Sequence, residues 1–113
     1  MKSSLNNRHC EACEGIGTAL NHEQINQLMP QLVDGWTAVN DNTAIKKSFS
    51  FKNFYETMAF VNALAWIANV ENHHPDLEVG YNYCHVRFNT HALKGLSHND
   101  FICAAKTDKL LLA

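Results

Sequence analysis

A long apolar helix between two pairs of alternating segments is the feature that most constrains how this chain can fold. Asn53, with Glu56 three residues later, predicts an N-cap and a capping box. Pro75 ends the pattern, because the residue before a proline is pushed out of the α region. The apolar residues between them recur at helical spacing: Phe54, Met58, Val61, Ala65 and Ala68, broadened by Phe60, Leu64 and Ile67. So wide an apolar face is typical of a helix that lies across a sheet.

The flanking segments predict two β-hairpins. Residues 36–40 and 44–51 are joined by a polar turn at 41–43, and apolar and polar residues alternate in the second of them. After the helix, Val79, Tyr81 and Tyr83 alternate with polar neighbours, as do Val86 and Phe88. Further helices are expected from Asn21 and from a Ser97 cap. The order αββαββα predicts an α+β fold, a four-stranded antiparallel sheet covered on one face by three helices.

Length and charge limit the classes of function. The chain has 113 residues, with nine Lys and Arg against eleven Asp and Glu. We expect a flexible leader over residues 1–18 and a single domain over 19–113. A near-neutral charge argues against a nucleic-acid-binding protein. No secretory signal and no stretch long enough to cross a membrane are visible, so a cytoplasmic location without membrane contact is expected.

The leader carries two of the four cysteines, Cys10 and Cys13, at a spacing used by zinc ribbons and redox motifs. A zinc ribbon needs a second such pair, and Cys84 and Cys103 are too far apart to supply it. A redox motif needs a strand before it. An incidental or structural role is therefore favoured, and metal or redox chemistry stays open.

Histidine is unusually frequent, with seven residues. His73 and His74 fall where the long helix must end, and His91 follows the last strand in a loop that can approach that helix end. Imidazole exchanges protons near neutral pH, so the three predict a proton-transfer site. Two alternatives remain: simple helix C-caps, and a zinc site made by the three imidazoles. His9, His22, His85 and His98 are expected to be structural or exposed.

Taken in order, a set of residues closely resembles the pterin-4a-carbinolamine dehydratase family, especially bacterial members associated with phenylalanine hydroxylase. The set comprises His73-His74-Pro75, Tyr81, Thr90-His91, Gly95-Leu96-Ser97 and Asp100, together with Gly35-Trp36 and the Cys-Glu-Ala-Cys leader. The resemblance runs from about Asn21 to Leu110. It implies dehydration of a 4a-hydroxytetrahydropterin to a quinonoid dihydropterin, with no metal and no organic cofactor.

The resemblance also implies roles for individual residues. His73 and His91 would carry the acid and base roles, and His74 would bind and orient the pterin. The expected pocket is completed by Pro75, Thr90 and Ala92, with Trp36 and Asp100 beside it. Asn72 stands where some members have an acid, so a supporting carboxylate at that position is absent.

Partners follow from the resemblance too. Family members assemble as dimers or tetramers and recycle the pterin of an aromatic amino-acid hydroxylase, so we expect a homodimer or homotetramer with that functional link. The alternative function is a non-catalytic interaction or dimerisation module on the same fold.

Overall fold

The computed structural model describes residues 5–11 and 17–111, and the second cysteine of the leader, Cys13, lies outside them. The helices α1, α2 and α3 span His22–Leu28, Phe54–Glu71 and His98–Lys109. The strands β1 to β4 span Thr37–Val39, Ala44–Ser50, Asp76–Val79 and Tyr83–Phe88. Short 3₁₀ turns occupy Leu5–Asn7 (η1), Met29–Gln31 (η3) and His91–Leu93 (η4).

The four strands form one antiparallel sheet in the order β1-β2-β4-β3. The longer strands of the two hairpins, β2 and β4, pair at its centre, where Ile45 lies opposite Phe88 and Phe49 opposite Cys84. This confirms the predicted α+β fold with its four-stranded antiparallel sheet and three helices.

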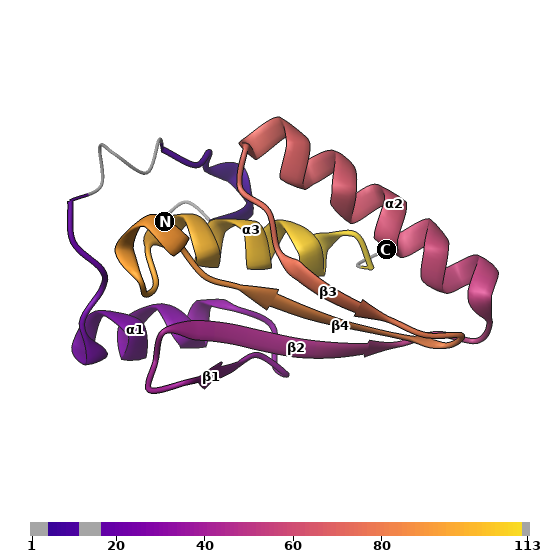
Figure 1. Ribbon diagram of the computed structural model, residues 1–113, viewed down its shortest axis with the longest axis horizontal. Helices are drawn as coiled ribbons and strands as arrows, with labels where there is room; N and C mark the ends of the chain where they lie inside the picture. The colour runs from indigo at the N-terminus through magenta and orange to yellow at the C-terminus, as the bar shows by residue number, and fades with distance from the viewer. Residues whose placement is uncertain (1–4, 12–16, 112–113) are drawn as a thin grey trace.

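The helices and the sheet share a core on one side of the sheet, and α2 and α3 run along its length (Figure 1). Alternation along β4 shows which face of the sheet meets the core. Cys84, Val86 and Phe88 are buried, whereas Tyr83, the first residue of the strand, is exposed. Ile25 and Leu28 of α1 belong to the same core. Lys46, Ser48 and Ser50 of β2 lie on the opposite face of the sheet, whereas Lys47 lies on the core face and pairs with Asp108 of α3.

Helix α2 begins as predicted, with the Asn53 side chain accepting from the backbone N–H of Glu56 at 2.9 Å. The capping box is incomplete, because the Glu56 carboxylate accepts from Lys52 N instead. The buried face consists of Thr57, Phe60, Leu64 and Ala68. The predicted stripe was therefore misplaced in part: Phe54 is half exposed and Ala65 is exposed, since the sequence pattern is apolar on more than one side of the helix.

The end of α2 differs from the prediction in its cause. The helix stops at Glu71 because Asn72 adopts the left-handed conformation (φ 53°, ψ 42°), three residues before Pro75. Asparagine tolerates this conformation better than most residues. The last hairpin is also tighter than expected, because β3 ends at Val79 and leaves Tyr81 in the turn.

The N-terminal segment is tied to the domain where the structure describes it. Leu5 is buried in the core, and Lys106 of α3 donates to the backbone carbonyl of Asn6 at 2.9 Å. The described residues of the leader thus contact the domain, and the flexibility of residues 1–18 stays a prediction. Among the helices of the described ranges, none has the length and apolar character that crossing a membrane requires.

Candidate active site

A cavity of about 360 Å³ lies where the end of α2, the start of β3 and the turn η4 meet. It is lined by His73, His74, His91, Pro75 and Ala92, which the sequence predicted, and by Asn72, Asp76 and Asn89, which it did not. The three additional residues immediately adjoin predicted ones in the chain. Their proximity was the one signal that could have found them.

The turn after α2 places His73 at the inner wall of this cavity. With Asn72 left-handed, the chain reverses and His73 N donates to the carbonyl of Ala68 at 3.1 Å. The His73 ring is buried, 6 % exposed, and lies almost parallel to Phe88 at a centroid distance of 6.2 Å. His74, the next residue, is exposed at the rim. The two imidazoles of the pair thus occupy different environments, one buried and one exposed.

The central contact of the site joins His73 to Asp100. Nε2 of His73 lies 2.6 Å from Oδ1 of Asp100, and the Asp100 side chain is fully buried. The other carboxylate oxygen, Oδ2, accepts from Thr90 Oγ1 at 2.8 Å and from Ser97 N at 3.0 Å. The last of these contacts completes the capping box of α3. Asp100 therefore holds an imidazole and caps its helix at once.

These contacts fix the direction of each proton around an ionised Asp100. A carboxylate only accepts, so Nε2 of His73 carries a proton and Nδ1 is the nitrogen left to accept one in the neutral ring. The single hydroxyl proton of Thr90 goes to Asp100. Ser97 Oγ, 2.8 Å from Thr90 Oγ1, then donates to Thr90 while accepting from Asn99 N. The buried carboxylate thus has three donors, and this matches the rule that buried charges are hydrogen-bonded.

His91 reaches the cavity from a separate element. It is the first residue of η4, and the left-handed Lys94 (φ 53°) closes this turn. A bridge between Thr90 and Gly95 holds the two ends of the loop together. His91 and Ala92 are both exposed, so this side of the cavity is open to a ligand.

Three of the residues predicted in or beside the pocket, Thr90, Trp36 and Asp100, do not line the cavity. Thr90 is buried behind it, where it supports Asp100. Trp36 is buried in the core, and its indole N–H donates to Asp108 Oδ2 at 2.8 Å. Asp108 also pairs with Lys47 at 2.7 Å. The ring of Phe88, 6.0 Å from Trp36 and 6.2 Å from His73 between centroids, contacts both.

Metal ligation by the histidines has no geometric support. Over the described ranges, no three His, Cys, Asp or Glu side chains are grouped so that they could hold a metal ion. His73 instead directs a ring nitrogen to Asp100.

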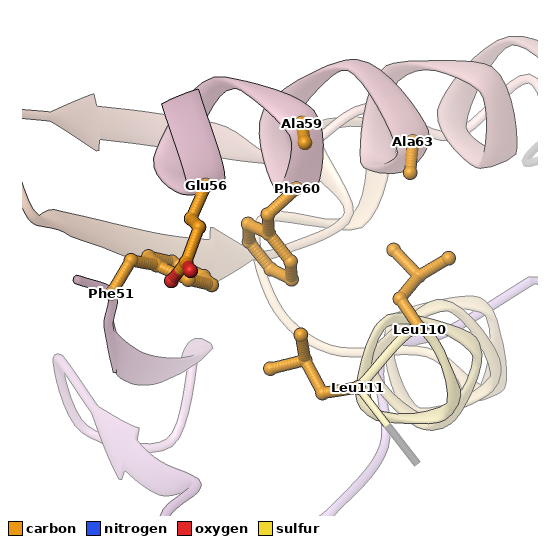
Figure 2. Close-up of a pocket in the computed structure, with 7 residues that line it drawn as sticks. All are labelled: Phe51, Glu56, Ala59, Phe60, Ala63, Leu110 and Leu111. Carbon is orange, nitrogen blue, oxygen red and sulfur yellow. The ribbon is translucent and has the colours of Figure 1, made fainter. Parts of the chain in front are cut away.

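A second cavity, of about 320 Å³, lies between α2 and the end of α3. The side chains of Phe51, Phe60, Leu110 and Leu111 surround a common hollow, with the Glu56 carboxylate at its edge (Figure 2). It shares no lining residue with the first cavity, and no imidazole lines it. Of these two cavities, only the one at His73 is lined by imidazoles.

Known proteins resemble the chain throughout its length. Residues 18–110 match the family model described as pterin 4 alpha carbinolamine dehydratase. A protein of Legionella pneumophila (strain Lens), named "Putative pterin-4-alpha-carbinolamine dehydratase", is 73 % identical over 99 % of both chains. A Nitrosospira multiformis protein of the same name is 58 % identical over 94 % of this chain and 91 % of its own.

A solved structure is similar to this chain in both sequence and fold. The crystal structure of a transcriptional coactivator/pterin dehydratase from Brucella melitensis is 31 % identical, with a TM-score of 0.78 over 82 % of this chain and 98 % of that one. The family model covers residues 18–110, and the Legionella pneumophila relative covers nearly the whole chain. The chain belongs to the pterin 4 alpha carbinolamine dehydratase family.

Proposed function

We propose that the protein dehydrates a 4a-hydroxytetrahydropterin to a quinonoid dihydropterin by histidine acid/base catalysis. The observation that carries the proposal is the cavity at which His73, held by the buried Asp100, meets His74 and His91. Membership of the dehydratase family supports the substrate class.

The reaction needs two proton transfers and no other reactant. An acid protonates the hydroxyl on C4a, which leaves as water when its C–O bond breaks. A base removes the proton from the neighbouring ring nitrogen, and the nitrogen electron pair forms the new C=N bond. His73 and His91 divide these roles. Positioned proton transfer of this kind typically contributes about 10²- to 10⁴-fold to a rate.

The remaining residues of the site bind and position. His74, Pro75 and Ala92 line the cavity and contact the pterin, and His74 orients it. Asp100 holds the His73 ring by Nε2, and Thr90 holds Asp100 in turn. The chain itself supplies every group that this reaction requires, so we propose that it needs no cofactor.

Stopped-flow measurement of the dehydration of a 4a-hydroxytetrahydropterin tests the roles of the imidazoles. His73→Ala and His91→Ala should each lower the rate by about 10²-fold or more, since each removes one proton-transfer group. The matched control is His98→Ala, an exposed histidine in the first turn of α3, which should keep the wild-type rate. Full activity in both site variants, with folding unchanged by circular dichroism, would refute the assignment.

The physiological setting follows from the substrate. An aromatic amino-acid hydroxylase releases the 4a-hydroxypterin, and we propose that this protein returns it to a form that a reductase can reuse. We also propose that the chain acts in the cytoplasm as a homodimer or homotetramer. The exposed apolar side chains on α2 support the homo-oligomer.

The competing candidate is an interaction module without catalysis. The name of the Brucella melitensis relative includes a coactivator role, and the exposed apolar side chains of α2 would suit a protein partner. The same stopped-flow assay separates the two, because a module of this kind would not accelerate the dehydration even with all three imidazoles in place.

A further inference from the structure

Two cysteines that are distant in the sequence meet at the surface of α3. The sulfur of Cys10 lies 3.4 Å from the sulfur of Cys103, although 93 positions separate them in the chain. Cys103 is fully buried, whereas Cys10 is half-buried and the more accessible of the two. Neither belongs to the cavity at His73.

The backbone around Cys10 is held on both sides, so the approach of the sulfurs is built into the fold. The Cys10 N–H donates to Glu71 Oε1 at 2.7 Å. The next residue, Glu11, pairs with the side chain of Asn99 through two hydrogen bonds of 2.9 and 2.7 Å. His9 adds a contact of 2.8 Å to Glu71. Glu71 and Asn99 are themselves nearly buried, which makes them firm anchors.

We propose that Cys10 and Cys103 form a redox modification site, which a peroxide converts into a disulfide that ties the N-terminal segment to α3. A disulfide has a sulfur–sulfur distance near 2.05 Å, so the two sulfurs must approach by about 1.4 Å. The half-buried Cys10 side chain can supply most of this movement by rotating about its Cα–Cβ bond, while Cys103 is fixed within a helix.

The chemistry is balanced with hydrogen peroxide as the oxidant. The Cys10 sulfur attacks one peroxide oxygen and the O–O bond breaks. Cys10 becomes a sulfenic acid, and the other oxygen leaves as water. The Cys103 sulfur then attacks the Cys10 sulfur and expels a second water as the S–S bond forms. Two thiols are oxidised and one peroxide is reduced to two waters.

The surroundings of Cys10 set the rate of the first step. The hydrogen bond with Cys103, burial and the nearby Glu71 carboxylate all raise the pKa of the Cys10 thiol. The thiolate, which is the reactive form, is therefore scarce near neutral pH. The pair should stay reduced without an oxidant, and its oxidation should become faster as the pH rises above neutrality.

Peptide mass spectrometry after peroxide treatment of the full chain tests the proposal. In the folded protein we expect the Cys10–Cys103 link to exceed the Cys10–Cys13 link by at least tenfold. In the urea-unfolded chain the order should reverse, because the shorter loop closes more easily. Cys13→Ser and Cys84→Ser are matched controls that keep the link, and Cys103→Ser abolishes it.

Thermal unfolding gives a second measure that does not depend on dehydratase activity. A link across so long a loop restricts the unfolded chain, so the oxidised protein should melt about 5 °C or more above the reduced one. Dithiothreitol should reverse the shift, and Cys103→Ser should not show it. A predominant Cys10–Cys13 or intermolecular disulfide in the folded protein, or no disulfide at all, would overturn the proposal.

Discussion

At the scale of single residues, the site depends on a carboxylate that the sequence places 27 positions from its imidazole. Asp100 has no exposure and three donors, so its charge is stabilised by fixed hydrogen bonds and not by water. Asn72, the residue before His73, has no carboxylate to offer. The carboxylate that supports His73 comes from another helix.

Replacing Asp100 by asparagine tests two effects of the carboxylate, its orientation of His73 and its contribution to the stability of the fold. The amide keeps the volume but can accept at only one of its two positions. With its oxygen toward Thr90 and Ser97, its NH₂ donates to Nε2 of His73 and holds the neutral ring with the proton on Nδ1, so Nδ1 no longer accepts a proton. We expect the dehydration rate to fall by roughly 10²-fold. The free energy of unfolding should fall by about 1–3 kcal/mol. Stopped-flow kinetics and urea denaturation measure the two effects.

Asp108→Asn is the matched control, because Asp108 is another buried acid of α3 and binds Trp36 and Lys47 instead of a histidine. It should lose stability by a similar amount and retain its catalytic rate. An equal loss of rate in both variants would show that Asp100 acts only by stabilising the fold.

At the scale of elements, the end of α2 decides where the imidazole pair lies. The left-handed Asn72 ends the helix, turns His73 toward Phe88 and leaves His74 at the rim. Pro75 comes too late to end the helix and instead directly precedes β3. If the helix ended one residue earlier or later, the rings of His73 and His74 would shift relative to η4.

Substitutions at Asn72 should follow the cost of this conformation. Asn72→Ala is expected to destabilise the fold by about 1 kcal/mol, since a Cβ without a polar group disfavours left-handed backbone. Asn72→Gly should be neutral or stabilising because glycine adopts it freely. Urea denaturation measures both variants.

Asn69→Ala provides the reference, because Asn69 is an exposed residue of α2 with ordinary helical backbone. It should gain a few tenths of a kcal/mol from helix propensity. If Asn72→Ala were as stable as Asn72→Gly, the left-handed turn would not be the feature that ends the helix.

At the scale of the whole molecule, one side of α2 remains uncovered although it is apolar. Tyr55 is 88 % exposed and Trp66 71 % exposed, and Phe54 and Val70 are at least half exposed. A cluster of exposed aromatic side chains on a monomer marks an interaction surface. A second copy of the chain is the occupant that we propose, in line with the expected homodimer or homotetramer.

Trp66→Glu should weaken this self-association, because a carboxylate would be buried without a partner in the interface. Sedimentation-velocity measurements on the wild type should show a dimer or tetramer, and the variant should show a larger monomer fraction at equal concentration. Tyr81→Ser, which alters an exposed aromatic residue in the β3–β4 turn, should leave the assembly intact. A wild-type monomer at all accessible concentrations would contradict the inference.

The sequence by itself determined the order of the elements and most of the residues that line the cavity. Alternation in β2 and β4 and the caps at Asn21, Asn53 and Ser97 are local signals, and the structure confirms the elements that they predicted. The side of α2 that is buried was predicted only in part. An apolar pattern that surrounds a helix does not say which side meets the sheet.

Only the tertiary structure decided which distant groups touch. In the structure Asp100 contacts His73, the Trp36 indole donates to Asp108, and the sulfur of Cys10 lies beside that of Cys103. Each of these contacts joins residues on separate elements, so its geometry depends on the packing of whole elements. Periodicity and capping report local backbone preference, which contains no such information. The chemistry of the site follows from both, since the residue types come from the sequence and their distances come from the fold.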